Sequence, residues 1–143
     1  MRDIVILGST GSIGVQALEV IAANPTKFRV VGLSAGSNNL ERLAEQVKKF
    51  SVPIVGTTGD TSLLKNVLPG VEVIDGPDSS RQIAALSCDV VLNGITGSIG
   101  LGPTLAALEV GNKVALANKE SLVAGGDLVM AQDRKSTRLN SSH

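Results

Sequence analysis

The sequence is almost without aromatic residues. Among 143 residues there are two phenylalanines, no tryptophan and no tyrosine. This scarcity argues against a protein that binds single-stranded nucleic acid, because such proteins stack bases on aromatic side chains. A hydrophobic core must instead be built from Val, Ile, Leu and Ala, a composition typical of a parallel sheet covered by helices.

Net charge, cysteine and long apolar runs are scarce as well. Basic and acidic residues each number 13, so no oppositely charged partner is indicated. The single cysteine, Cys88, cannot form a disulfide within the chain, and its apolar neighbours predict a small buried or half-buried thiol. No apolar run reaches membrane-spanning length, and nothing resembles a signal peptide. These absences predict a cytoplasmic protein with no nucleic-acid or membrane partner.

Residues 133–143 differ in character from the preceding chain. They are polar, basic and aperiodic, and they contain the only histidine, His143. The stretch resembles the in-frame translation of a common DNA-sequencing adapter, so we expect a disordered tail and assign no function to His143. A natural disordered terminus is the alternative. Residues 1–132 then form one domain, as the length predicts, truncated at its C-terminal side.

A glycine-rich turn near the N-terminus carries the clearest functional signal. An apolar run over residues 4–7 leads into residues 8–14, which have glycine at every third position, and an amphipathic helix follows. Glycines let the backbone approach an anion, and the N–H groups of a helix N-terminus point at it. We expect Ser9, Thr10 and Ser12 to add hydroxyl donors, and Thr10 or Ser12 to cap the helix. The turn predicts a nucleotide-phosphate site, although its spacing differs from the usual Gly-x-Gly-x-x-Gly fingerprint; a plain strand-to-helix turn is the alternative.

The second predicted strand, residues 28–33, leads into a stretch of amides and hydroxyls. In NAD-binding units, an Asp or Glu after this strand bonds to the ribose 2′-hydroxyl. This chain has Gly36, Ser37, Asn38 and Asn39 there instead. Amides and hydroxyls can donate to a 2′-phosphate, which a carboxylate would repel, so the pattern favours NADP over NAD. The alternative is a helix N-cap, and Asn39 is able to serve in both roles.

The rest of the chain alternates short apolar runs with helical patterns. This alternation predicts an α/β fold, a doubly wound and mostly parallel Rossmann-like sheet with helices on both faces. Residues 96–100 repeat residues 10–14 letter for letter. We favour two turns that meet the same steric need over a duplicated nucleotide-binding half, with a lining role beside the nicotinamide as a lesser alternative. Further strands are expected at residues 53–55, 71–74, 89–92 and 113–117, and further helices at residues 40–50, 60–68, 79–87, 103–109 and 122–131.

Polar side chains follow the sixth predicted strand. Ligands bind at the carboxyl ends of strands in open α/β sheets. Lys119 is placed to hold a substrate phosphate, and Glu120 to contact a ribose or to orient the lysine. A helix start with an acidic residue near its N-terminal dipole is an equally supported alternative.

Three motifs taken together resemble the 1-deoxy-D-xylulose 5-phosphate reductoisomerase family. They are Gly-Ser-Thr-Gly-Ser-Ile-Gly at residues 8–14, Ala-Gly-Ser-Asn at residues 35–38 and Ala-Asn-Lys-Glu-Ser-Leu-Val at residues 117–123. The resemblance covers residues 1–132. It implies an NADPH-dependent enzyme that converts 1-deoxy-D-xylulose 5-phosphate to 2-C-methyl-D-erythritol 4-phosphate in non-mevalonate isoprenoid biosynthesis.

The resemblance also implies roles for individual residues. Lys119 would bind the phosphorylated ketose substrate. Many family members carry lysine at the position of Ser37, so a cation that would pair with the 2′-phosphate is missing here. The NADPH pyrophosphate would be bound by Thr10, Gly11, Ser12 and Ile13. The adenosine ribose and 2′-phosphate would be bound by Gly36, Ser37 and Asn38. A further contact with the cofactor would come from Asn118 and Glu120.

The resemblance places the divalent-metal ligands, for Mg²⁺ or Mn²⁺, outside this sequence. In the family they lie in an Asp-Ser-Glu stretch and a further Glu downstream of Lys119, and nothing equivalent precedes Gln132. The rearrangement needs a metal to polarise the substrate oxygens. We therefore expect no catalytic residue and no turnover in residues 1–132 alone, and a homodimer for the whole enzyme. Another NADP-dependent dehydrogenase, of the homoserine or semialdehyde type, and a non-catalytic nucleotide-binding module are the alternatives.

Overall fold

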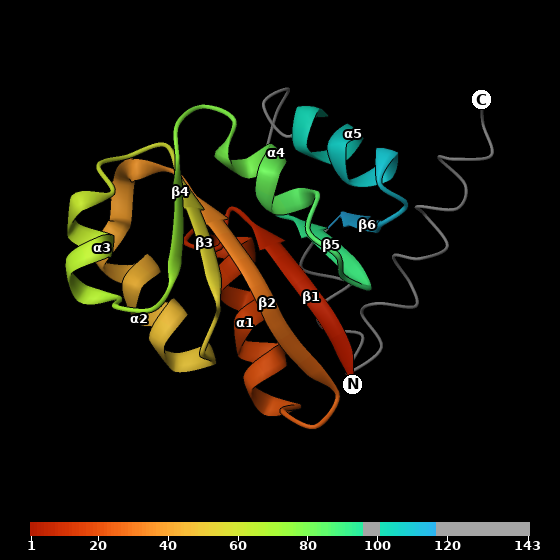
Figure 1. Cartoon of the computed structure of the whole chain (residues 1–143). Coiled ribbons are helices and arrows are strands. Elements are labelled where there is room, and N and C mark those ends of the chain that lie inside the picture. The colour runs from red at the N-terminus through yellow and green to blue at the C-terminus, as the bar shows by residue number, and fades with distance from the viewer. Residues whose placement is uncertain (96–100, 117–143) are drawn as a thin grey trace.

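The structure, a computed structural model, contains a six-stranded parallel sheet with helices on both faces (Figure 1). It describes residues 1–95 and 101–116. The strand order is β4-β3-β2-β1-β5-β6, and every neighbouring pair is parallel. The elements in chain order are β1 (Arg2–Leu7), α1 (Ser12–Ala23), β2 (Phe28–Ala35), the 3₁₀ turn η1 (Ser37–Asn39), α2 (Leu40–Phe50), β3 (Ile54–Thr57), α3 (Ser62–Val67), β4 (Glu72–Asp75), α4 (Ser79–Ala84), β5 (Val90–Asn93), α5 (Leu101–Glu109) and β6 (Lys113–Leu116).

The central strand β1 shows why the sequence forms a sheet covered on both sides. Ile4, Val5, Ile6 and Leu7 are each at most 1% exposed. Successive side chains of a strand point to opposite faces, so Ile4 and Ile6 enter one core while Val5 and Leu7 enter the other. A strand buried on both faces therefore reads as a continuous apolar run.

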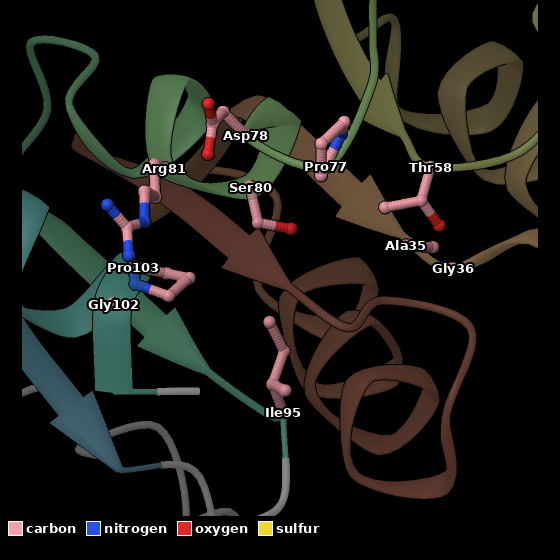
Figure 2. A pocket seen from close by; sticks show the side chains of 10 residues that line it. All are labelled: Ala35, Gly36, Thr58, Pro77, Asp78, Ser80, Arg81, Ile95, Gly102 and Pro103. Atoms are coloured by element: carbon pink, nitrogen blue, oxygen red, sulfur yellow. The ribbon is translucent and has the colours of Figure 1, made fainter. Parts of the chain in front are cut away.

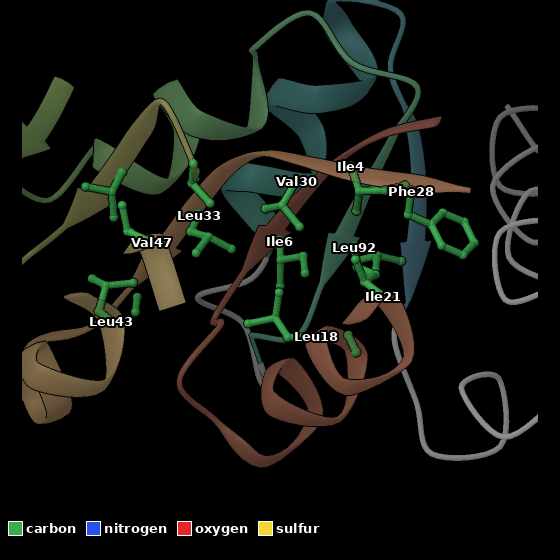
Figure 3. Close-up of a cluster of buried hydrophobic side chains, with 14 of the residues drawn as sticks. Ile4, Ile6, Leu18, Ile21, Phe28, Val30, Leu33, Leu43, Val47 and Leu92 are labelled. Carbon is green, nitrogen blue, oxygen red and sulfur yellow. The ribbon is translucent and has the colours of Figure 1, made fainter. Parts of the chain in front are cut away.

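The larger core lies under α1, α2 and α3. Figure 3 shows Leu18 and Ile21 of α1 beneath Ile6 and Leu92, and the same cluster includes Leu43 of α2. These helical residues recur at spacings of three and four, which puts them on one face of their helix. The apolar stripes of the sequence thus cover this face of the sheet as expected.

The second core lies under α4 and α5, and glycines bring α4 close to the strands. A Cβ at Gly32 of β2 would lie 2.8 Å from a methyl carbon of Leu86. A Cβ at Gly56 of β3 would lie 2.9 Å from Ile83 and 3.2 Å from Cβ of Ser79. With hydrogen at both positions, α4 packs directly against the backbone of β2 and β3.

The strand order contains a reversal between β1 and β5. From β1 the chain builds outward to β4, and it then crosses back through α4 to pair β5 with the other side of β1. The loops at the carboxyl ends of β1 and β5 therefore leave toward opposite faces, and open α/β sheets bind ligands at such a point. The fold expected from the sequence, a doubly wound parallel sheet, is confirmed.

The helix boundaries confirm one expected cap and correct another. Asn39 caps α2, because its side-chain oxygen accepts a 3.1 Å bond from the N–H of Arg42. Thr10 and Ser12 do not cap α1; Gly11 is at the N-cap, and no side chain bonds there. The expected helix over residues 122–131 and the tail over residues 133–143 lie outside the described residues. In the part of the chain that the structure describes, no helix is both long and apolar enough to cross a membrane.

Candidate functional site

The glycine turn (residues 8–14) joins β1 to α1 and is fastened to the neighbouring strand. Gly8 has φ of +73°, a left-handed conformation that favours glycine. The N–H groups of Gly8 and Ser9 donate to the carbonyl of Ser34 in β2, at 2.8 and 3.0 Å. The N–H of Gly11 returns to the carbonyl of Gly8 at 3.2 Å. The turn is therefore held at a fixed position above the ends of β1 and β2.

Gly14 lets α1 begin directly against this turn. A Cβ at Gly14 would lie 2.4 Å from the carbonyl oxygen of Gly8 and 2.6 Å from Cα of Ser9, so only hydrogen fits. The N–H groups in the first turn of any α-helix have no acceptor within the helix. Here these donors lie at the carboxyl edge of the sheet, where they favour a bound anion.

The side chains of the glycine turn divide into an exposed and a buried set. Gly11 and Ser12 are exposed, and Thr10 and Ile13 are half-buried, so the predicted pyrophosphate residues lie together on an accessible surface. Ser9 is fully buried, and its hydroxyl has no hydrogen-bond partner among the described residues. The expectation that Ser9 donates to a ligand is therefore wrong, because its side chain points into the protein.

Sequence reasoning missed Gln46 of α2, whose buried side chain forms a hydrogen bond with the backbone of the glycine turn. Gln46 is 8% exposed, and its Nε2 donates a 2.9 Å bond to the carbonyl of Ser9. The sequence offered one indication of this role: Gln46 adjoins Val47 on the apolar stripe of α2, and an amide buried there needs a hydrogen-bond partner. Gln46 connects the glycine turn to the helix that follows η1.

The segment over residues 36–38 leads from β2 into α2 and is exposed along its length. A Cβ at Gly36 would have no atom within 4 Å, so this end of the strand is open. On the other side, a Cβ at Gly59 would lie 2.6 Å from Cβ of Ser37, so the loop after β3 packs against Ser37. Residues 36–38 thus have open space at Gly36 and pack at Ser37 against the loop that follows β3.

The turn after β5 meets the glycine turn at the reversal of the sheet. The N–H of Gly94 donates to the carbonyl of Leu7 at 2.9 Å, and a Cβ at Gly94 would lie 3.1 Å from that oxygen. Asn93 at the end of β5 is buried, accepts from the N–H of Ile95 at 2.9 Å and donates to the hydroxyl of Thr104 at 2.6 Å. This network fixes the start of the second loop.

A cleft of about 440 Å³ opens beside these segments. Figure 2 shows Ala35, Gly36 and Thr58 on one side, and Arg81, Gly102 and Pro103 on the other. Ser80 lies between the two sides and is anchored by its hydroxyl, 3.1 Å from the hydroxyl of Ser34. The remaining lining residues are Pro77, Asp78 and Ile95.

The cysteine lies at the opposite end of the sheet. Cys88 precedes β5, whereas the predicted binding segments follow the strands. Burial, together with the nearby carboxylates of Asp89 and Asp3, raises the pKa of the Cys88 thiol to about 11. A half-buried thiol with this pKa stays protonated at neutral pH. The expectation of a buried or half-buried thiol is confirmed.

Other predicted site residues are not described. Asn118, Lys119 and Glu120 lie outside the described residues, as does the repeated motif at residues 96–100. Within residues 1–95 and 101–116, no group of His, Cys, Asp and Glu side chains is arranged to hold a metal ion. Residues 10–13 and 36–38 follow the neighbouring strands β1 and β2 at the same edge of the sheet, and Gln46 of α2 bonds to the carbonyl of Ser9 beside the first segment.

Comparisons of the sequence with known proteins agree with one another. A family model described as 1-deoxy-D-xylulose 5-phosphate reductoisomerase matches residues 4–126. The enzyme of that name from Beutenbergia cavernae is 51% identical over 96% of this chain and 36% of its own length. The enzyme from Leifsonia xyli subsp. xyli is 56% identical over 90% of this chain and 31% of its own length. The chain thus spans about a third of the length of these curated relatives.

Solved structures with the same fold bear the same name. The reductoisomerase from Zymomonas mobilis in complex with NADPH matches with a TM-score of 0.75 and 36% identity, over 95% of this chain and 37% of that one. A reductoisomerase in complex with NADPH, fosmidomycin and magnesium matches with a TM-score of 0.75 and 32% identity, over 95% of this chain and 35% of that one.

Proposed function

Because this chain belongs to the 1-deoxy-D-xylulose 5-phosphate reductoisomerase family, we propose that it forms the NADPH-binding part of such an enzyme. The whole enzyme would convert 1-deoxy-D-xylulose 5-phosphate to 2-C-methyl-D-erythritol 4-phosphate in isoprenoid biosynthesis. Residues 4–126 match the family model, which favours this assignment over a dehydrogenase of the homoserine or semialdehyde type.

One observation carries the proposal: α2 connects the two segments predicted to bind the cofactor. It begins at Leu40, two residues after Asn38, and Gln46 in its second half donates to the carbonyl of Ser9. The glycine turn would bind the pyrophosphate through backbone N–H groups and the hydroxyls of Thr10 and Ser12. Residues 36–38 would bind the adenosine ribose and its 2′-phosphate.

The residues present fit NADPH. Gly11 and Ser12 at the start of α1 are exposed, and a Cβ at Gly36 would meet no atom within 4 Å, so both segments have room for a ligand. When bound, NADPH supplies a hydride, and the role of this chain is to orient the dinucleotide across the reversal of the sheet. A divalent metal, which a solved relative contains, has no fitting ligand set among the described residues. We assign no metal-dependent step to them.

The substrate belongs to the same proposal. A solved relative binds fosmidomycin together with NADPH, so we propose a phosphorylated ketose as the substrate of the whole enzyme. Lys119 would bind it, and Asn118 and Glu120 would contact the cofactor; these three lie outside the described residues. Homodimerisation and a cytoplasmic location remain predictions.

Replacing Gly36 with aspartate tests the cofactor site. A side chain at this position meets no atom within 4 Å, so the fold should tolerate it. A carboxylate beside the 2′-phosphate would repel it, and we expect the Kd for NADPH to rise at least about tenfold while the Kd for NADH changes little. Gly36→Asn, nearly the same size without charge, is the matched control and should bind NADPH like the parent chain.

The assay is a titration that follows NADPH fluorescence, which the chain does not obscure because it has neither tryptophan nor tyrosine. An unchanged ratio of the Kd values for NADPH and NADH in Gly36→Asp would contradict the assignment of residues 36–38. NADPH oxidation by the 143-residue chain with 1-deoxy-D-xylulose 5-phosphate and Mg²⁺ would contradict our expectation that this chain alone does not turn over.

A further inference from the structure

The cleft continues from Gly36 into a space with mainly apolar walls. Ala35, Pro77, Ile95 and Pro103 supply the apolar surface. Its volume of about 440 Å³ lies within the range of small-molecule sites, about 300–1,000 Å³. A ligand group that follows a ribose bound at Gly36 would enter this space.

Arg81 faces the cleft from the side opposite Gly36 (Figure 2). Its side chain is exposed, and no hydrogen bond or ion pair engages it within the described residues, even though Asp78 lines the same cleft. The guanidinium has five N–H donors and two flat faces. A cation at this position is therefore available to a ligand.

The orientation of the guanidinium follows from its contact with α5. A Cβ at Gly102 would lie 2.7 Å from Nη2 and 2.8 Å from Nε of Arg81, but 3.1 Å from the central carbon. The Nη2–Nε edge therefore points at Gly102, so the contact with Gly102 does not cover the flat faces of the guanidinium. The missing side chain at Gly102 makes room for this arrangement.

A flat, uncharged ring is the ligand group that this surrounding favours. Guanidinium groups stack on aromatic faces, and apolar walls exclude water from a ring but offer nothing to a phosphate. The 2′-phosphate is already assigned to residues 36–38, across the cleft. We infer that Arg81 stacks on the adenine ring of the cofactor and is a specificity-determining residue for its adenosine end.

This inference rests on the proposed function, and two substitutions test it. Arg81→Ala removes both the positive charge and the planar guanidinium group, whereas Arg81→Lys keeps the charge and removes the planar group. For stacking, we expect Arg81→Ala to raise the Kd for NADPH and for adenosine 2′,5′-bisphosphate about fivefold to tenfold, and Arg81→Lys to raise both nearly as much. Isothermal titration calorimetry gives the Kd values, and circular dichroism confirms that each variant is folded.

Lys65→Ala on α3 is the matched control, because it removes one exposed positive charge outside the cleft. It should leave both Kd values unchanged. The inference is overturned if Arg81→Ala binds both probes like the parent chain, or if Arg81→Lys does so, since the latter would mean that charge alone matters. If the parent chain binds neither NADPH nor the bisphosphate, the proposed function fails and takes the inference with it.

Discussion

Replacing Gly14 with alanine would push α1 away from the turn that precedes it. The added Cβ would lie 2.4 Å from the carbonyl oxygen of Gly8 and 2.6 and 2.7 Å from Cα and the carbonyl carbon of Ser9. All three are backbone atoms, so no side chain can rotate out of the way. Restoring an ordinary contact of about 3.4 Å requires a displacement of about 1 Å between helix and turn.

The expected loss of stability follows from two opposing terms. Overpacking at a rigid site costs about 1–3 kcal/mol, and the clash with backbone places Gly14 near the upper end. Exchanging glycine for alanine within a helix recovers at most about 1 kcal/mol. We therefore expect Gly14→Ala to lower the free energy of unfolding by about 2 kcal/mol. With a slope of about 2 kcal/mol per molar urea, the midpoint should fall by about 1 M.

Gly11→Ala is the matched comparison. A Cβ at Gly11 would meet only the carbonyl oxygen of Gly8, at an ordinary 3.5 Å, and the backbone there is extended, with φ of −75°. Gly11→Ala should lose less than about 1 kcal/mol, because alanine is a poorer N-cap residue than the glycine at this position. NADPH binding should weaken, because the methyl group occupies the exposed surface proposed for the pyrophosphate. Urea unfolding followed by circular dichroism measures the first effect, and NADPH titration the second. A Gly14→Ala chain as stable as the parent would refute the steric reasoning.

Three further predictions concern groups outside the glycines. Gln46→Met should destabilise the fold by about 1–3 kcal/mol in urea unfolding, because the Ser9 carbonyl loses its buried donor; unchanged stability would remove Gln46 from its supporting role. Asn39→Ala should cost about 1 kcal/mol through loss of the α2 cap, and Asn39→Asp should retain most of it; equal losses in both would argue against capping. The Cys88 pKa of about 11 exceeds its ordinary 9.0, so the folded state holds the proton more tightly; the contribution of Cys88 to stability should be constant below pH 9 and be lost between about pH 9 and 11. Thiolate absorbance at 240 nm, folded against urea-unfolded, checks this, and equal titration midpoints would contradict it.

The elements of the fold could be predicted because each is specified locally. Apolar runs bounded by glycine and proline predicted all six described strands, and the expected helix over residues 40–50 coincides with α2. Asn39 was predicted as a cap because capping depends on neighbours along the chain. The two predicted binding segments are both accessible and lie at the carboxyl edge, since parallel strands share that edge.

The missed features depend on contacts between distant segments. Whether Ser9 points outward or inward is decided by the Ser34 carbonyl and by α2, neither of which is adjacent in sequence. The cleft draws on the ends of β2 and β5 and on the starts of α4 and α5, so it exists only once the strand order is known. Sequence reasoning therefore did not single out Arg81, which lies within the expected helix over residues 79–87.

The length of α2 has a consequence for how this part of the molecule can vary. Asn39 fixes the start of α2 by capping it, and Gln46, seven positions later and about two helical turns along, bonds to the Ser9 carbonyl of the glycine turn. Inserting or deleting one residue between them would rotate Gln46 by about 100° away from Ser9. The number of residues between the start of α2 and Gln46 therefore determines whether Gln46 reaches the glycine turn. Length changes should be better tolerated in the loop after α2, residues 51–53, than within the helix.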